Sequence, residues 1–192
     1  MGNYSYKRTL FFTPLMLILF SLVQCSPKLY TTGKDFVASG NYEDAIEQFT
    51  KLIDENPEYT EAYVARAEAY EKAGKKTEAA SDYKRATAFE DKDESIFYNA
   101  GRLYYELEDY KEAIPMLARV TALDKKHINA YKYKMESYNA VEQYDKAIKE
   151  SNELIALNET AGKYSNRGCI QDRVDDYKEA ETDYRKSIEK AS

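Results

Sequence analysis

Apolar side chains recur along this chain at the spacing of amphipathic helices. One stretch shows the pattern clearly, with apolar residues at Ala45, Ile46, Phe49, Leu52 and Ile53. Positions three or four residues apart share one face of a helix, so these side chains form a single apolar stripe. The chain also has only 7 Gly and 4 Pro in 192 residues, which is few for a loop-rich or all-β protein. The pattern therefore predicts an all-α fold.

The stripe returns about every 34 residues. An alanine marks the same position in each copy, at Ala45, Ala79, Ala113, Ala147 and Ala180. Twelve residues before these alanines stand, in order, Gly33, Ala67, Gly101, Met135 and Gly168. Four residues after them stand Phe49, Tyr83, Leu117, Ser151 and Tyr184. Periods of this length are typical of solenoids, in which each repeat packs only on its neighbours.

Each repeat is predicted to contain two helices. The predicted pairs are 27–39 with 42–54, 60–73 with 76–88, 94–107 with 110–122, 128–141 with 144–156, and 162–173 with 177–190. Gly40 and Gly74 stand where a first helix should end, because glycine is favoured just beyond a helix C-terminus. Asp109 should cap the start of a second helix, and Asn41 is a weaker candidate for the same role.

The repeat resembles the tetratricopeptide repeat, whose pattern is W-x₂-L-G-x₂-Y, then A-x₃-F, then a closing proline. The likeness extends from about Ser26 to Ala191, although no tryptophan is present and the closing proline survives only as Pro57. Ser151 is polar where the pattern has an aromatic residue, which should weaken the fourth repeat locally. The resemblance implies an all-α superhelical solenoid of about five repeats, near 26–59, 60–93, 94–127, 128–160 and 161–192.

The resemblance also implies a concave face, built by the first helices, that binds a protein or peptide partner. The aligned positions in the middle three repeats are Val64, Glu68 and Glu71, then Tyr98, Arg102 and Tyr105, then Lys132, Glu136 and Asn139. Tyrosine and arginine often dominate binding energy, so Tyr98 and Arg102 should matter for binding and little for stability. The mixed charge suits an amphipathic helix or an extended peptide of mixed charge. The alternative is that the convex face or the edges bind instead.

The first 24 residues have the pattern of a secretory signal. Lys7 and Arg8 precede an apolar run over 10–23, which at 14 residues is too short to span a membrane. The junction Leu22-Val23-Gln24-Cys25 resembles a bacterial lipoprotein signal, apart from Gln24, where a smaller residue is usual. The resemblance implies a lipid on Cys25 and a membrane-anchored protein in the bacterial envelope, on the periplasmic face of the outer membrane. An uncleaved anchor and an ordinary secreted protein remain alternatives.

Charge and composition exclude several other functions. The net charge of −6 argues against nucleic acid as the main partner, because phosphate contacts need clustered Lys and Arg. His127 is the only histidine, and no nucleophile or metal-ligand spacing accompanies it, so no catalytic residue, metal or cofactor is expected. Cys169, next to Gly168, is expected to be a small buried residue.

These observations favour a non-catalytic, lipid-anchored scaffold that assists assembly of an envelope complex. One alternative is a structural module that associates with itself through its C-terminal edge, since nothing follows the last repeat to cover that edge. The other is that the repeats form the N-terminal part of a longer protein with an effector domain.

Overall fold

The computed structural model describes residues 28–191, which form helices and no strands. A helix over residues 28–38 comes first. The others are α2 (Tyr42–Glu55), α3 (Thr60–Lys72), α4 (Lys76–Ala86), α5 (Glu94–Glu106), α6 (Tyr110–Leu123), α7 (Ile128–Ala140), α8 (Tyr144–Leu157), α9 (Ala161–Asp172) and α10 (Tyr177–Ala191). These bounds lie within about two residues of the sequence predictions wherever both ends are described. Cys25 and the leader lie outside the described residues.

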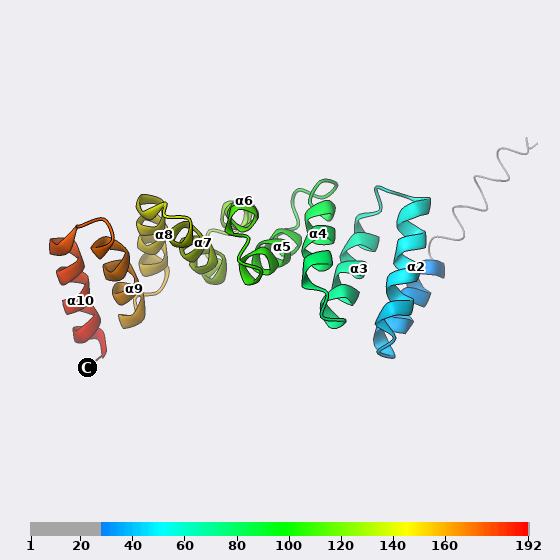
Figure 1. Cartoon of the computed structure of the whole chain (residues 1–192), viewed down its shortest axis with the longest axis horizontal. Coiled ribbons are helices and arrows are strands. Elements are labelled where there is room, and N and C mark those ends of the chain that lie inside the picture. Colours follow the sequence, from blue (N-terminus) through cyan, green and yellow to red (C-terminus); the bar gives the residue numbers. More distant parts are fainter. Residues whose placement is uncertain (1–27, 192) are drawn as a thin grey trace, which may run out of the picture.

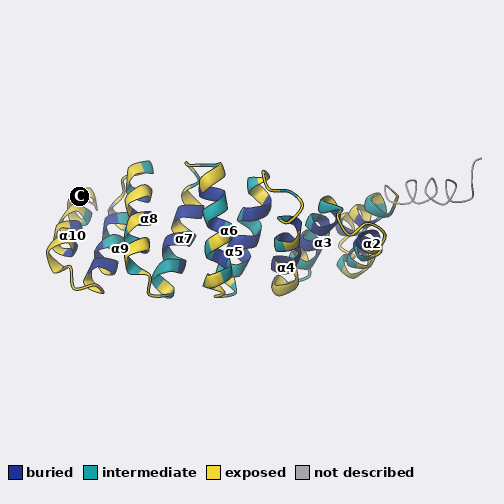
Figure 2. Cartoon of the chain, turned by 90° about the horizontal axis from the view of Figure 1, so that it is seen from above, coloured by how far each residue is buried: buried dark blue, intermediate teal, exposed yellow. Residues whose placement is uncertain are grey.

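The helices follow one another in an elongated row, with α2 near one end and α10 at the other (Figure 1). Each helix packs on its neighbours in the chain, as a solenoid requires. Buried residues line the inner sides of the helices, and exposed residues lie on their outer sides and in the turns (Figure 2). No helix in the described part of the chain is long and apolar enough to cross a membrane. The predicted all-α solenoid is confirmed.

The turn inside each repeat places one residue in the left-handed backbone region. The φ angles are +81° at Gly40 and +77° at Gly74, then +60° at Glu108, +61° at Glu142 and +59° at Asp175. The amide after each of these residues donates to a carbonyl five residues back, at 2.8–3.0 Å, and so closes the first helix. The two predicted glycine ends are confirmed. The last three repeats make the same turn with residues that disfavour it.

We expect Glu142→Gly to stabilise the protein by about 0.5–1 kcal/mol. A side chain in the left-handed region costs roughly 1–2 kcal/mol, and the added freedom of glycine in the unfolded chain offsets part of that gain. Urea denaturation monitored by circular dichroism measures the change. Gly74→Ala is the reverse test and should destabilise the protein, because glycine there already has φ of +77°. A loss of stability in Glu142→Gly would contradict the argument.

The two helices of a repeat approach closely where a small residue faces a large one. A Cβ atom added at Gly33 would lie 2.5 Å from Phe49 Cε1, and one added at Gly101 would lie 2.8 Å from Leu117 Cγ. Gly168 faces Tyr184 in the same way, at 2.9 Å. The small residues of the sequence pattern are therefore required by the aromatic or leucine side chain 16 residues later.

The fourth repeat reverses this pairing. Met135 takes the place of the glycine, and Ser151 takes the place of the large residue. Both side chains are buried, and the Ser151 hydroxyl lies 2.9 Å from Met135 Sδ. The larger side chain on α7 takes up part of the space that the smaller one on α8 leaves. The fourth repeat keeps the fold, and whether Ser151 weakens it stays a prediction that the contact with Met135 bears on.

Ion pairs join the two helices of three repeats within the core. Arg66 makes two hydrogen bonds to Asp82, at 2.7 and 2.8 Å. Equivalent pairs are Lys134 with Glu150 at 2.9 Å and Arg167 with Asp183 at 2.6 Å. Each basic side chain also bonds to the preceding second helix, through Thr50, Thr121 or Asn152. These pairs therefore link successive repeats as well as the helices within one repeat.

Helix starts follow the sequence predictions in part. The Asp109 side chain accepts a hydrogen bond from the Glu112 amide and caps α6 as predicted. Asn41 makes no side-chain cap at α2, so that prediction is wrong. His127 caps α7. Its Nδ1 accepts from the Ala130 amide at 3.1 Å, and its Nε2 lies 3.1 Å from Glu94 Oε1 on α5.

Candidate protein-binding face

The first helices of the repeats, residues 28–38 with α3, α5, α7 and α9, bring the predicted binding residues together. We call the surface that these residues form the first-helix face. It comprises Val64, Glu68, Glu71, Tyr98, Arg102, Tyr105, Lys132, Glu136 and Asn139. Lys132 is exposed and the other eight side chains are half-buried. The repeat alignment therefore selected positions that reach the surface.

Charged side chains on this face pair across neighbouring first helices. Lys34 Nζ lies 3.4 Å from Glu68 on α3. Arg102 on α5 donates to Glu71 on α3 at 2.6 Å and to Glu106 on its own helix at 2.7 Å. Glu68, Glu71 and Arg102, three of the five predicted charges, are thus in ion pairs before any partner arrives.

Aromatic side chains join α5 to α7. The Tyr105 hydroxyl donates to Glu136 at 2.6 Å, and its ring stacks on Tyr133 with centroids 4.7 Å apart. The Tyr98 ring lies 4.5 Å from the His127 ring and 6.4 Å from Tyr133. Tyr133, which the alignment did not select, fills the gap between the two helices. This aromatic cluster packs the third repeat against the fourth.

The ion pairs and hydrogen bonds set the protonation states on this face. Burial alone would lower the pKa of Arg102, but hydrogen bonds to Glu71 and Glu106 outweigh it, and the net pKa is raised. Burial, and then the hydrogen bond to Glu136, raises the pKa of Tyr105. Arg102 is therefore a permanent cation, and Tyr105 stays a neutral donor at physiological pH.

These contacts change one sequence expectation. Tyr98 and Arg102 were expected to contribute little to stability, but Arg102 links two helices and Tyr98 packs on two rings. Substitution of either residue should cost stability as well as binding. Lys132 is the better probe, because it is exposed and makes no ion pair with any described residue.

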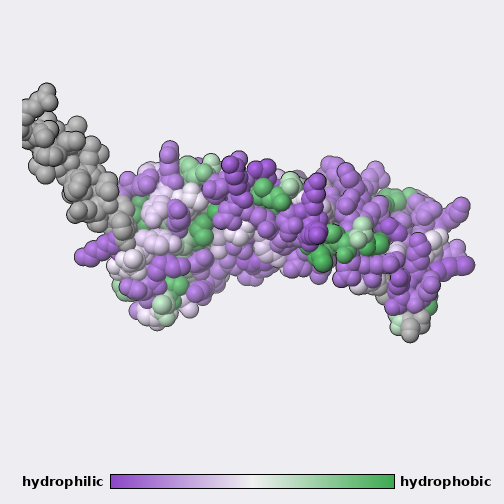
Figure 3. Space-filling view, turned by 180° about the vertical axis from the view of Figure 1, so that it is seen from behind, coloured by the Kyte–Doolittle hydropathy of each residue, from purple (hydrophilic) through white to green (hydrophobic). Residues whose placement is uncertain are grey.

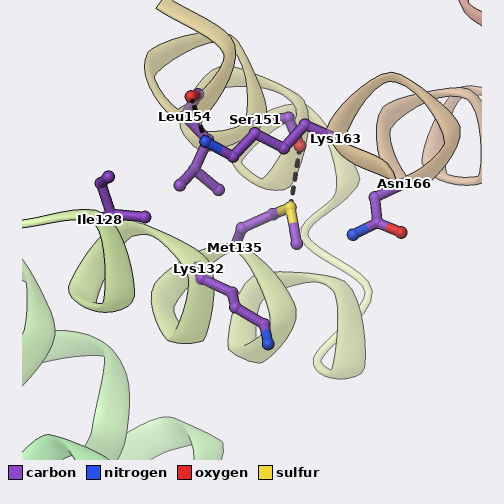
Figure 4. A pocket seen from close by; sticks show the side chains of 7 residues that line it. All are labelled: Ile128, Lys132, Met135, Ser151, Leu154, Lys163 and Asn166. Atoms are coloured by element: carbon purple, nitrogen blue, oxygen red, sulfur yellow. Dashed lines mark hydrogen bonds between the residues drawn. The ribbon is translucent and has the colours of Figure 1, made fainter. Parts of the chain in front are cut away.

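Two hollows open between first helices. One, of about 280 Å³, has Tyr30, Val64, Ile96 and acidic Glu61, Glu90 and Asp93 among its lining residues. The other is a smaller pit of about 70 Å³ between α7, α8 and α9, lined by Ile128, Lys132, Met135, Ser151, Leu154, Lys163 and Asn166. Figure 4 shows these seven side chains, with the Lys132 ammonium directed away from the others. Both hollows lie beside predicted binding residues.

Hydrophilic side chains dominate the surface seen from behind in Figure 3, and hydrophobic atoms gather there in small separate patches. Asn139 has one buried oxygen without a hydrogen-bond partner among the described residues. No group of three or more His, Cys, Asp or Glu side chains within residues 28–191 could hold a metal ion. The first-helix face therefore presents charged groups, aromatic rings and shallow hollows to a partner.

Cys169 is exposed, which corrects the expectation that it is buried. Its sulfur lies 3.5 Å from the Tyr184 hydroxyl. The repeat alignment could have predicted this exposure, because Cys169 occupies the position of Glu68, Arg102 and Glu136. The position in the repeat therefore predicts its exposure better than the residue type does.

Family models confirm the repeat. A tetratricopeptide-repeat model matches residues 30–94, and a second one matches residues 94–127 and 164–189. The chain belongs to the tetratricopeptide-repeat (TPR) family. The fourth repeat, where Met135 replaces the small residue and Ser151 replaces the large one, falls between the matched segments of the second model.

Curated relatives share the repeats over part of their length. Human DnaJ homolog subfamily C member 3 is 29% identical over 128 residues, which cover 67% of this chain and 25% of that protein. The TPR repeat-containing protein YpiA of Bacillus subtilis is 24% identical over 137 residues, 71% of this chain and 32% of YpiA. This chain thus spans about a quarter to a third of the length of these relatives.

Solved structures share the whole TPR fold. A crystal structure of MamA has a TM-score of 0.71 at 20% identity and covers 86% of this chain and 91% of MamA. YrrB, described as a TPR protein with an unusual peptide-binding site, has a TM-score of 0.70 at 18% identity, with 84% of each chain covered. At these identities the likeness shows the fold. The fold and the TPR relatives support a protein-interaction scaffold.

Proposed function

We propose that this TPR chain is a non-catalytic scaffold that binds a protein or peptide segment along the first-helix face, over α3, α5 and α7. The row of half-buried charged and aromatic side chains that crosses these three helices carries the proposal. Tyrosine and arginine in such positions give large contact area and directed hydrogen bonds. The peptide-binding description of YrrB supports the same use of the fold.

The pairing of charges determines which partner fits. Glu68, Glu71 and Glu136 already accept ion pairs or hydrogen bonds, and Arg102 already donates to two carboxylates. A strongly acidic or basic ligand would have to break these pairs and desolvate the charges again. An amphipathic helix or extended peptide of mixed charge therefore suits this face best.

The double variant Tyr98→Ala with Arg102→Ala tests the location of the site. Partners are captured with the detergent-extracted wild-type protein and identified by mass spectrometry, and affinity for the purified partner is then measured by calorimetry. We expect the double variant to weaken binding by about 2 kcal/mol or more, as hot spots do. Arg66→Ala is the matched control, since it also loses buried ion-pair contacts but lies outside this face. Full affinity in a folded double variant would place the site elsewhere.

We further propose that Cys25 carries a lipid and holds the repeats at the bacterial envelope, where they assist assembly of an envelope complex. The motive is the basic and apolar leader that ends in Leu22-Val23-Gln24-Cys25. Acyl chains contribute about 0.8 kcal/mol per buried methylene, so two or more chains anchor a protein stably. We expect intact-mass measurement of the native protein to show acyl mass on Cys25, and Cys25→Ala to leave the membrane fraction. An unmodified Cys25 would reject the lipid anchor.

Self-association through α10 is a second candidate. Ile188 is 72% exposed and Tyr177 is 63% exposed on that helix. Against it, Ser187 stands where Leu52 and Leu154 pack on the following repeat, so the outer face of α10 is less apolar. Light scattering distinguishes self-association from peptide binding by a monomer. A dimer that Ile188→Lys dissociates would favour self-association.

A further inference from the structure

The pit between α7, α8 and α9 lies beside two short side chains, Ser151 and Asn166. One repeat earlier, Tyr133 on α7 fills the corresponding gap and packs its ring on Tyr98 and Tyr105 of α5. The residue of α9 that stands 33 positions after Tyr133 is Asn166. Its small amide leaves open a cavity of about 70 Å³ at the place where the preceding repeat holds a ring.

The wall of the pit is apolar. Met135 and Leu154 are buried, and Ile128 is 39% exposed although it is a large aliphatic residue. Two of the polar groups in the wall have partners. The Ser151 hydroxyl contacts Met135 Sδ, and the Lys163 ammonium donates to the carbonyls of Leu154 at 3.0 Å and Asn158 at 2.7 Å. The Lys163 methylene groups therefore add to the apolar lining.

The pit is lined by two ammonium groups, those of Lys132 and Lys163, and that of Lys163 is held by two backbone carbonyls. Lys132 is exposed, and no described residue forms an ion pair with it. By contrast Arg102, which lies on the same face, is neutralised by Glu71 and Glu106. An apolar hollow beside an available ammonium group complements a ligand that carries an aliphatic group next to a carboxylate.

We propose that the pit receives a branched aliphatic side chain of the partner peptide, and that an Asp or Glu adjacent to it pairs with Lys132. The pit has a volume of about 70 Å³, about half that of an enclosed cavity of roughly 150 Å³ that binds benzene, so the proposal commits to an aliphatic side chain in place of a ring. This specificity rests on the proposed peptide-binding function and adds repeat four and α9 to its site.

A random dodecapeptide display library, selected on the detergent-solubilised full chain, tests the proposal. We expect the enriched peptides to carry Leu, Ile or Val within one or two residues of Asp or Glu. Lys132→Glu should weaken the best peptide at least tenfold and, in a new selection, favour Lys or Arg at that place. Lys111→Glu makes the same charge change at an exposed position of α6 and should leave affinity unchanged.

Asn166→Tyr is the second variant. It places at α9 the ring that Tyr133 supplies one repeat earlier, so it should fill the pit and lower affinity at least tenfold. Thermal unfolding shows whether Asn166→Tyr is folded. If Asn166→Tyr does not fold, the test rests on Lys132→Glu, which changes an exposed residue.

Several results would overturn the proposal. A library without enrichment, or one enriched in aromatic or basic peptides, would reject the specificity. Selected peptides that bind Lys132→Glu and folded Asn166→Tyr as tightly as wild type would reject the pit. If those same peptides lost affinity for Tyr98→Ala with Arg102→Ala, the first-helix face would remain the binding site and only the role of the pit would be wrong.

Discussion

Glu150→Met should destabilise this protein by about 3–5 kcal/mol, because it leaves a buried ammonium group without its counter-ion. Lys134 Nζ lies 2.9 Å from Glu150 and 2.8 Å from the Thr121 hydroxyl, and the two charged side chains are only 8% and 11% exposed. The Thr121 hydroxyl and the Tyr131 ring, whose centroid is 4.9 Å from the ammonium, carry no negative charge and cannot replace the carboxylate. Chemical denaturation of the wild type and the variant measures the loss.

The third repeat supplies the rescue. At the positions of Lys134 and Glu150 it has Ala100 and Met116, 34 residues earlier, and it folds without an ion pair there. The double variant Lys134→Ala with Glu150→Met should therefore recover most of the stability that the single change loses. Replacing a buried ion pair with apolar groups is often neutral or stabilising, whereas breaking it is not. Equal stability of Glu150→Met and wild type would contradict this account.

The repeat period was enough to predict the fold. Helix positions follow from apolar stripes, and stripes are local features that one chain displays without any neighbour. The turns were harder, because Glu108, Glu142 and Asp175 adopt the left-handed conformation that the sequence signals only at glycine. Their equal spacing from Gly40 and Gly74 is the signal that could have found them.

The core ion pairs were missed, although the alignment contained them. Arg66, Lys134 and Arg167 are basic at one repeat position, and an acidic residue follows each of them after 16 positions. Sixteen residues separate facing positions of the two helices, as Gly33 and Phe49 also show. A comparison of the residues 16 positions apart within each repeat would have predicted these contacts.

The candidate binding face shows the limit of alignment more clearly. The repeat register placed all nine residues on the correct helices and at the surface. It did not show that Arg102 reaches Glu71, or that Tyr133 stacks on Tyr105, because those contacts depend on the twist between successive repeats. Which charges remain available to a partner is therefore known only from the structure. Lys132 is a charged residue that the repeat alignment places on this face and that the structure leaves without an ion pair to any described residue.

Ser151→Phe should restore the usual residue type of the family at that position and nevertheless destabilise the protein by about 1–3 kcal/mol. Phenylalanine or tyrosine occupies this position in the first, second and fifth repeats, where a glycine or alanine faces it. In the fourth repeat Met135 occupies part of that space, both side chains are buried, and the open pit beside them is only about 70 Å³. The added ring would have to displace Met135 or separate α7 from α8.

Met135→Gly with Ser151→Phe should remove the conflict, because it recreates the pairing of Gly33 with Phe49. Met135→Gly alone should also be destabilising, since it leaves a cavity beside a serine and places glycine inside a helix. The double variant should therefore be more stable than the two single losses together predict, with a coupling of about 2 kcal/mol in the resulting cycle. Denaturant midpoints of the four proteins give that value. Additive losses would mean that Met135 and Ser151 do not compensate for each other, and that the fourth repeat is held together by other contacts.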